Sequence, residues 1–173
     1  SIGWVRGGPR TLIRALQDVV TRAGTIVMPS FAYCYEKIYS PAAPYDAATS
    51  PSQTGLVAET FRKCPGVVRS GHPSHSVAAW GRLAKELTEG HEHLAALDAD
   101  TPFHRAARRG AKVCMIGCDF RALSLLHVAE ALADAPYLRI FGWWSHGWKP
   151  AELLRRKDGK VLRTCYSSVP GCS

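Results

Sequence analysis

The sequence lacks the hydrophobic runs and the leader that would place it in or across a membrane. Among its 173 residues no apolar run approaches the roughly 18 residues that span a bilayer. The opening residues, Ser-Ile-Gly-Trp-Val-Arg, are not a charged segment followed by an apolar core. We therefore expect a cytoplasmic protein that does not bind membranes. Hydrophobic residues make up 46% and charged residues 21% of the chain, which predicts one globular domain over residues 1–173.

Short motifs that mark several kinds of enzyme are missing as well. There is no Gly-x-Ser-x-Gly elbow, so a serine hydrolase of the usual α/β type lacks its best signal. Gly7-Gly8 belongs neither to a Walker loop nor to a Gly-x-Gly-x-x-Gly loop. There is no Cys-x-x-Cys pair. His91-Glu-His93 is the one metal-like cluster, and because no third ligand stands at a usable spacing, we expect no metal site.

Six cysteines are present, but a chain this large and rich in core residues does not need disulfides. Cys114 and Cys118 flank the apolar run 113–117, which is typical of a buried strand. We expect the cysteines to be structural free thiols, because free cysteine behaves as a small buried hydrophobe.

Acidic residues are fewer than basic ones, 14 against 22, and the net charge is +8. Much of the excess lies in residues 105–112 and 149–163. Such a surface attracts polyanions in general, whether nucleic acid, phosphorylated cofactors or acidic lipid heads. Because no aromatic-basic motif or zinc-finger spacing accompanies the charge, a solvated basic face is favoured and nucleic acid is not an expected partner.

Helix and strand patterns alternate along the chain, which predicts an α/β fold of three layers with a mixed sheet. The helix patterns run from Pro9 to Gly24, after a cap at 50–53, and over 82–89, 101–109 and 123–134. The extended patterns are 25–28, two segments around a turn at His72-Pro73, the clear buried strand 112–117, 137–148, and 161–166 behind a hairpin turn at 157–160. Residues 30–49 are expected to be irregular.

The helix expected at 123–134 follows the strand expected at 112–117 through a short turn. Its apolar side is formed by Leu125, Leu126, Ala129, Leu132 and Ala133. His127 and Glu130 are three residues apart and hence neighbours on one helical face. A neutral imidazole oriented by a carboxylate is a good general base, and ligands gather at the carboxyl ends of strands in α/β sheets. The alternative is a polar helix face, which the spacing alone favours.

Two loops carry further candidates for chemistry. His72-Pro-Ser-His-Ser76 places two imidazoles and two hydroxyls in five residues, which can bind a carbonyl or phosphate oxygen or supply a base. Local turn chemistry explains the same residues equally well. Gly7-Gly-Pro-Arg10 precedes a helix whose free N–H groups can hold an anion, although an ordinary helix start is the simpler interpretation.

Several of these pieces stand in one order that is specific when taken together. They are Ser-Ile-Gly-Trp-Val-x-Gly-Gly at 1–8, Gly-Thr-Ile-Val-Met-Pro at 24–29, Thr-Ser-Pro-Ser-x-x-Gly-Leu-Val-Ala-Glu-Thr-Phe-Arg at 49–62, Pro-Gly-Val-x-Arg-Ser-x-His-Pro-x-x-Ser-x-Ala-Ala-Trp-Gly at 65–81 and Ser-Leu-x-His-x-Ala-Glu at 124–130. Over residues 1 to about 136 the chain closely resembles the aminoglycoside N3-acetyltransferases, antibiotic acetyltransferases that use acetyl-CoA and do not have the GNAT fold.

The resemblance implies roles for individual residues. His127 would take the proton from the attacking amine, with Glu130 or Glu59 near it, and His72 would line the site. The residues expected to bind acetyl-CoA, the co-substrate, are Ser1, Gly3, Gly7, Gly8, Ser74, Ser76 and Thr101. Because aminoglycosides are polycations, carboxylates are expected at the acceptor, and the candidate residues there are Tyr33, Asp98, Asp100 and Asp119.

The resemblance also implies a strand and a His-Ser-Ser-Leu-type stretch before Ser1, and further chain after Ser173, so we expect the sequence to be part of a longer protein. Residues 137–173 depart from the family in being basic and aromatic. The expected acceptor is therefore an aminoglycoside or another small amine, with a homodimer as an alternative to a monomer. Two other hypotheses stay open: a catalytically degenerate binding protein, and a hydrolase using Ser74 or Ser76 with His72 or His75.

Overall fold

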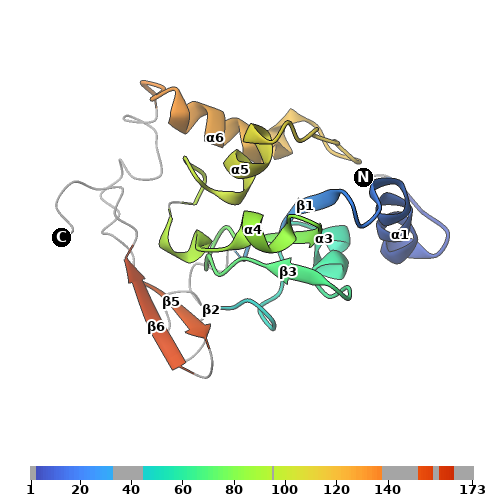
Figure 1. Cartoon of the computed structure of the whole chain (residues 1–173), viewed down its shortest axis with the longest axis horizontal. Coiled ribbons are helices and arrows are strands. Elements are labelled where there is room, and N and C mark those ends of the chain that lie inside the picture. Colours follow the sequence, from blue (N-terminus) through green and yellow to red (C-terminus); the bar gives the residue numbers. More distant parts are fainter. Residues whose placement is uncertain (1–2, 33–44, 95, 138–151, 158–159, 166–173) are drawn as a thin grey trace.

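The computed structural model describes residues 3–32, 45–94, 96–137, 152–157 and 160–165. The helices are α1 (Gly8–Val20), α3 (Leu56–Phe61), α4 (Ala84–Thr88), α5 (Pro102–Arg108) and α6 (Ser124–Leu132), with 3-10 turns η1 (His91–His93) and η2 (Phe120–Ala122). The strands are β1 (Thr25–Pro29), β2 (Tyr45–Asp46), β3 (Val67–Arg69), β4 (Val77–Gly81), β5 (Glu152–Lys157) and β6 (Lys160–Cys165). Figure 1 shows α1 at one end of the molecule and the β5–β6 hairpin at the other.

The described strands form two small sheets. In the first, the order is β1-β4-β3 and both pairs are antiparallel, with Ile26 opposite Trp80 and Val68 opposite Ala79. In the second, the order is β2-β5-β6, and β2 runs parallel to β5. The α/β content is therefore as expected, whereas a three-layer sandwich around one mixed sheet stays a prediction.

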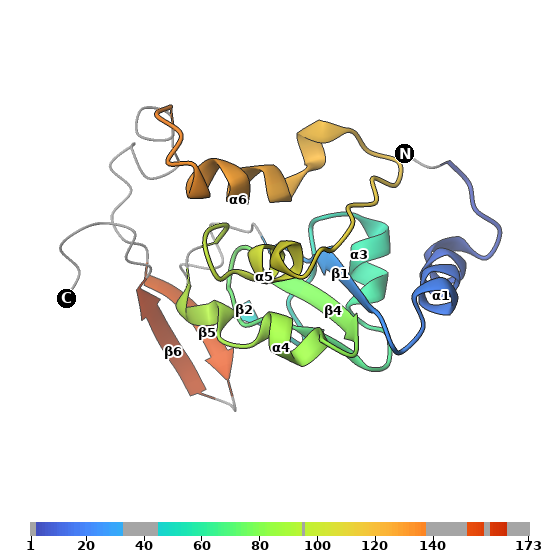
Figure 2. The same cartoon turned by 45° about the horizontal axis from the view of Figure 1, so that its top comes forward.

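The core lies where α1 and α3 meet the central strand β4. Ile13, Phe61, Ala78 and Trp80 form one buried cluster. Side chains alternate along a strand, so Val77 and Ala79 point to the other face of β4, and they are fully buried too. Helix α4 packs against all three strands of this sheet, and Figure 2 shows it beside β4. Because both faces of β4 are buried, this strand fixes the position of the turn that precedes it.

Helix α1 confirms the predicted start signal, but it ends at Val20, before the predicted stop at Gly24. Pro9 occupies the first turn, where its missing N–H costs nothing, and Gly7 before it is left-handed with φ of 82°. The helix ends when Thr21 donates its N–H to the Gln17 carbonyl. The turn at 72–73, the strands beside it and the helices within 82–89 and 101–109 are confirmed in the same way.

The strand predicted at 112–117 is wrong. The segment has no strand pairing among the described residues and is mostly exposed, with Val113 at 52% and Ile116 at 36%. Cys114 and Cys118 are exposed free thiols rather than buried ones, and Cys64 is a half-buried free thiol. The apolar composition of residues 112–117 predicted burial. A buried strand requires neighbouring strands, however, and the described part of the chain supplies none there.

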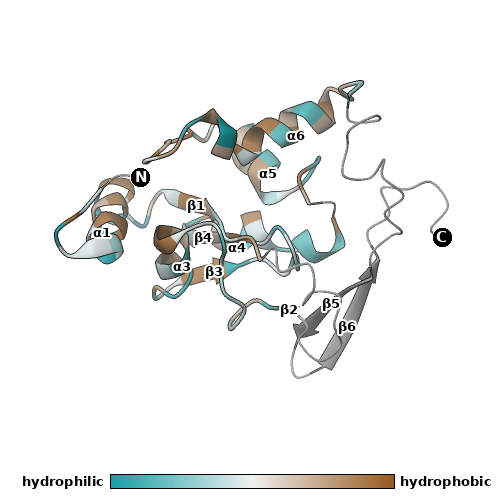
Figure 3. Ribbon diagram, turned by 180° about the vertical axis from the view of Figure 1, so that it is seen from behind, coloured by the Kyte–Doolittle hydropathy of each residue, from teal (hydrophilic) through white to brown (hydrophobic). Residues whose placement is uncertain are grey.

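Three smaller expectations were also wrong. Helix α3 begins after Gly55, whose φ of 106° marks the break, and not after a cap at 50–53. Residues 30–49 contain the short strand β2. On α6 the buried residue is Val128, which was not on the predicted apolar side, whereas Leu126 and Leu132 are about half exposed. Figure 3 shows apolar and polar residues side by side along α6.

In the C-terminal hairpin Lys157 pairs with Lys160, as the predicted hairpin requires, while residues 158–159 lie outside the described residues. Several predictions fall outside the described residues. They concern the extended pattern at 138–148, most of the basic and aromatic segment after it, and the cysteines Cys34 and Cys172. Among the described helices none is long and apolar enough to cross a membrane.

Candidate functional site

The turn between β3 and β4 is closed by the side chain of His72. Its Nδ1 accepts the backbone N–H of His75 at 2.9 Å and that of Ser74 at 3.3 Å. A ring nitrogen that accepts two N–H groups carries no proton itself, so His72 is the Nε2–H tautomer. The side chain is 1% exposed. His72 therefore shapes the turn from inside rather than facing solvent.

A second buried imidazole, His91, packs against the first. The ring centroids of His72 and His91 lie 4.7 Å apart. His91 Nδ1 bonds the Ser70 hydroxyl at 2.9 Å, and Nε2 lies 3.4 Å from the Ala96 carbonyl. Ser70 Oγ also accepts the N–H of Val77 at 2.8 Å. The contact between the two rings and the hydrogen bond from His91 to Ser70 thus join η1 to the β3–β4 turn.

Burial keeps these imidazoles neutral, because water would solvate the charged form better. Burial and then the charges of His91 and His75 hold the pKa of His72 well below its usual range. Burial lowers the pKa of His91 to about 3, against the opposing effect of the Ala96 carbonyl. Burial, followed by the charge of His127, lowers the pKa of His75 to about 4. All three are neutral at pH 7.

His75 connects this cluster to α6. Its Nδ1 bonds Ser74 Oγ at 2.8 Å, and its ring packs on Phe31 with centroids 4.8 Å apart. Phe31 in turn meets Phe103 of α5 edge to face. Since the charge of His127 acts on the pKa of His75, His127 lies near the buried imidazoles.

His127 and Glu130 form the pair that their spacing predicted. His127 Nδ1 lies 2.8 Å from Glu130 Oε2, with the histidine side chain 52% exposed and the glutamate side chain 18% exposed. Hydrogen bonds from Tyr137 and then from His127 lower the pKa of Glu130. The carboxylate is therefore ionised at pH 7 and accepts the Nδ1 proton, which leaves Nε2 of His127 as an acceptor. Figures 1 and 2 show α6 beside α5.

Glu59, the other carboxylate expected near His127, is occupied elsewhere. It accepts from Arg62 Nε at 2.6 Å, from Lys63 Nζ at 2.5 Å and from the N–H of Ser52 at 2.6 Å. The hydrogen bond from Arg62 is the main cause that lowers the pKa of Glu59 to about 2. These contacts tie the start of α3 to the segment before it and include none with His127.

Ser76 is buried and its hydroxyl is already used. It donates to the Ser30 carbonyl at 2.6 Å and accepts Nε of Arg69 at 3.1 Å. Ser30 Oγ is also buried, and it has no hydrogen-bond partner among the described residues. Ser76 therefore holds the backbone here, whereas the Ser74 hydroxyl bonds the ring of His75.

The remaining predicted residues are dispersed. Thr101 is fully buried and donates to the Asp98 carbonyl at 2.7 Å, which closes the turn before α5. Asp98 and Asp100 flank that turn, with Asp98 accepting the N–H of Ala99. Asp119 is exposed, and hydrogen bonds from Arg121 lower its pKa.

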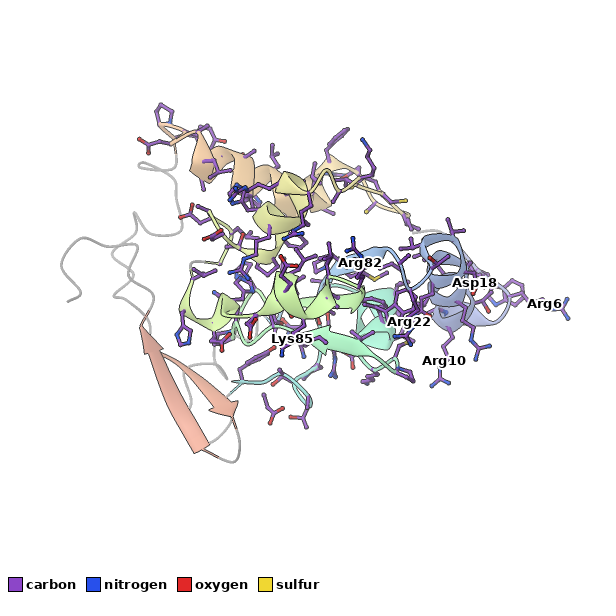
Figure 4. The ribbon with its side chains drawn as sticks, in the orientation of Figure 1. Arg6, Arg10, Asp18, Arg22, Arg82 and Lys85 are labelled. Carbon is purple, nitrogen blue, oxygen red and sulfur yellow. The ribbon has the colours of Figure 1, made fainter. Side chains whose placement is uncertain are left out.

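At the start of α1, no described side chain caps the helix and no acidic residue lies in the first turn. Gly7 and Gly8 have positive φ, as does Gly3. Arg6 and Arg10 are exposed beside this end and point outward in Figure 4. Helix N–H groups and two guanidinium groups make this end attractive to anions. Ser1 and Tyr33 lie outside the described residues.

Sequence reasoning missed three members of the site. His91 was considered only as a metal ligand, and the part of the chain described here holds no group of three ligands that suits a metal. Tyr137, which bonds Glu130, and Arg69, which bonds Ser76, were not singled out. The Arg69-Ser70-x-His72 run was a usable signal, because an arginine just before a turn of small polar residues can bond several carbonyls.

The arrangement is thus an exposed imidazole–carboxylate pair on α6 near a rigid turn of buried imidazoles. Compared with known proteins, the sequence model of the aminoglycoside 3-N-acetyltransferases matches residues 1–165. The chain belongs to this family.

Individual family members agree with that assignment. The chain is 35% identical over 158 residues to aminoglycoside N(3)-acetyltransferase VII of Streptomyces paromomycinus. This match covers 79% of this chain and 52% of that relative. Its fold is similar to the crystal structure of aminoglycoside acetyltransferase AAC(3)-Xa, with a TM-score of 0.78, 28% identity and coverage of 99% of this chain and 67% of that one. It is also similar to AAC-IIIb in a binary complex with CoASH, with a TM-score of 0.75, 28% identity and coverage of 98% and 67%. The chain spans about half the length of the curated relative.

Proposed function

We propose that this chain carries the general base of an acetyl-CoA-dependent N-acetyltransferase and that His127 is that base. The observation that supports this most is the 2.8 Å contact between His127 Nδ1 and Glu130 Oε2, on a helix where half of the imidazole is exposed. A base must meet its substrate, and of the histidines at this site only His127 combines exposure with a carboxylate partner among the described residues.

The proposed reaction is a direct transfer. Glu130 accepts the Nδ1 proton of His127 and so fixes the tautomer whose Nε2 accepts. Nε2 takes the proton of the attacking amine while the amine nitrogen bonds to the thioester carbonyl carbon. The carbon–sulfur bond then breaks, and the thiolate of coenzyme A leaves and takes up a proton. A positioned donor must stabilise the oxyanion in between, and such a donor is worth about 100- to 1000-fold in rate.

The turn at 72–76 is the proposed source of that donor. The hydroxyl hydrogen of Ser76 already bonds the Ser30 carbonyl, which makes Ser74 the better hydroxyl for the thioester oxygen or the pantetheine arm. We propose that the phosphates of acetyl-CoA meet the start of α1 after Gly7 and Gly8, because no side chain caps that helix and Arg6 and Arg10 lie alongside. The N–H of Gly8 itself already donates to the Val5 carbonyl at 2.8 Å. Gly3, Thr101 and the turn of His72 complete the proposed binding residues.

The proposed acceptor is an amine, either an aminoglycoside or another small amine. Related structures hold sisomicin and a gentamicin, both polycations. Asp98 and Asp100 are the carboxylates proposed to meet such an acceptor, whereas Asp119 is paired with Arg121. A cytoplasmic location, a single domain, a three-layer sandwich and a homodimer stay predictions from the sequence.

A serine hydrolase is the second candidate, because Ser74 Oγ lies 2.8 Å from His75 Nδ1. A hydroxyl and an imidazole at that distance resemble an activated nucleophile. However, a pKa of about 4 makes His75 a weak base at pH 7. The acyltransferase is therefore favoured.

Calorimetric titration of acetyl-CoA into the chain, followed by release of free thiol with a panel of aminoglycosides and simple amines, tests the proposal. We expect binding, and turnover that His127→Ala abolishes. The absence of both binding and turnover would reject the transferase. Ester hydrolysis that Ser74→Ala removes and His127→Ala leaves intact would establish the hydrolase instead.

A further inference from the structure

Arg69, the last residue of β3, connects two separate stretches of backbone, one after β1 and one after β2, to the β3–β4 turn. Its Nη2 donates to the Ser30 carbonyl at 2.6 Å, and its Nη1 donates to the carbonyls of Ser50 and, at 3.3 Å, Ala47. Its Nε donates to Ser76 Oγ at 3.1 Å. One guanidinium thus binds the chain after β1, the chain after β2 and the far end of the turn.

No described carboxylate forms an ion pair with Arg69, and its four acceptors are neutral oxygens. The face of the group lies over the ring of Tyr45, with 5.2 Å from Cζ to the ring centroid. A planar fork with five donors on three nitrogens suits these four acceptors, whereas the ammonium of lysine carries only three donors on a single atom. The hydrogen bonds to these neutral oxygens therefore depend on the planar shape of the guanidinium group and not only on its charge.

The turn that carries His72 and His75 is held by the same groups that Arg69 contacts. The hydroxyl of Ser76 and Nη2 of Arg69 share the Ser30 carbonyl. The N–H of Ala32 donates to the Ser74 carbonyl at 2.8 Å, so the segment after β1 runs along the turn. Tyr45 donates its hydroxyl to the Ser70 carbonyl at 2.9 Å. Both ends of the turn therefore rest on Arg69 or on a residue that it touches.

We propose that Arg69 is a positioning residue for acetyl transfer: its guanidinium, bonded to the carbonyls of Ser30, Ala47 and Ser50 and to Ser76 Oγ, fixes the turn of His72 and His75 relative to the segments after β1 and β2. This inference rests on the proposed function, since it concerns the same site. Arg69 acts through the turn and does not touch the reacting atoms. A displacement of about 1 Å at a reacting centre can cost about 100-fold in rate.

Arg69 also lines an open hollow of about 290 Å³ with Tyr45, Gly71, Lys85 and Glu89, and Lys85 marks its α4 side in Figure 4. A small cation can therefore reach the place of a truncated side chain from solvent. This makes chemical rescue the sharpest test, because guanidinium restores the planar fork whereas methylammonium restores only a charge.

The first experiment compares kcat and KM of the Arg69→Ala chain with and without guanidinium at a concentration too low to denature. We expect kcat to fall by about 10- to 100-fold with the KM for the amine unchanged, and guanidinium, but not methylammonium, to restore part of it. The matched control is Arg105→Ala: Nη1 of Arg105 also donates to three carbonyls, those of Glu86, Leu87 and Glu89, but all lie at the end of α4. That variant should lose stability and keep kcat.

The second experiment does not depend on turnover. Ring resonances of His72 and His75, recorded by NMR, should shift in Arg69→Ala and return with guanidinium. If the parent chain transfers no acetyl group, the proposed function fails, yet these resonances still decide the role of Arg69. If Arg69→Ala does not fold, Arg69→Lys replaces it and should show the same shifts. Unchanged resonances, an unchanged kcat, or equal rescue by methylammonium would overturn the proposal.

Discussion

Two histidine environments in this chain differ in almost every physical respect. His72 and His91 are buried and pack on one another; Nδ1 of His72 accepts backbone N–H groups and Nδ1 of His91 bonds Ser70. His127 is half exposed and faces a carboxylate on its own helix. The same side chain thus serves as a neutral packing and turn-closing group in one region and as a candidate base in the other. The difference comes from burial and partner, not from residue type.

The largest expected effect is on stability. His91→Ala removes a buried ring and leaves Ser70 Oγ with the N–H of Val77 as its remaining partner among the described residues, so the free energy of unfolding should fall by about 3–5 kcal/mol. His127→Ala removes an exposed side chain and should change it by less than about 0.5 kcal/mol. Urea unfolding of both variants measures this. Equal losses would mean that the two regions do not differ in the way the contacts indicate.

The next expected effect is that low pH lowers the free energy of unfolding through the buried histidines. The pKa of His75 is about 4 and that of His91 about 3 in the folded chain, against 6.5 for an ordinary histidine. Between pH 6.5 and 4 the unfolded chain therefore binds more protons, so stability is full above pH 6.5 and falls as the pH drops. Each histidine contributes up to about 1.4 kcal/mol per pH unit in that window. Glu59, with a pKa lowered from 4.5 to about 2, adds its own loss only below pH 4.5.

His75→Gln tests this assignment because glutamine does not titrate in that range. The slope of unfolding free energy against pH between 6.5 and 4 should become flatter by the share of one histidine. Chemical unfolding at half-unit pH steps measures the slope. A slope identical to that of the parent would show that His75 is not kept neutral by its surroundings.

Glu130→Gln should weaken the exposed pair without removing it. The amide still accepts the Nδ1 proton of His127 but no longer stabilises the imidazolium, so kcat should fall by about 10- to 100-fold, less than for loss of the base. Glu86→Gln is the matched control, because Glu86 also pairs with a cation, Arg109, from an exposed helical position. A kcat that falls equally in both variants would point to a general charge effect.

Much of this fold is visible in the sequence where the signals are local. Pro9 lies in the first turn of α1, and the His72-Pro73 turn separates two strands, because these residues act through their own backbone geometry. The contact between His127 and Glu130 follows from helical spacing for the same reason.

Features that depend on distant partners were not visible. Strand β2 exists through pairing with β5, more than half the chain away. The contacts of Arg69 join carbonyls from two distant stretches of the sequence, so the local run around Arg69 does not indicate which carbonyls it binds. The apolar run at 112–117 predicts a strand by its composition, but composition does not say whether neighbouring strands are there to cover it.

That run offers the smallest expected effect and the clearest contrast with α6. Val113 is 52% exposed and Val128 is 1% exposed, although sequence patterns predicted burial for the first and not for the second. Val128→Ala should cost about 2 kcal/mol of unfolding free energy because it opens a buried site, whereas Val113→Ala should cost less than about 0.5 kcal/mol. Urea unfolding compares the two identical substitutions. A large loss at Val113 would mean that the 112–117 segment is covered in solution, and the strand predicted from its sequence would then be correct after all.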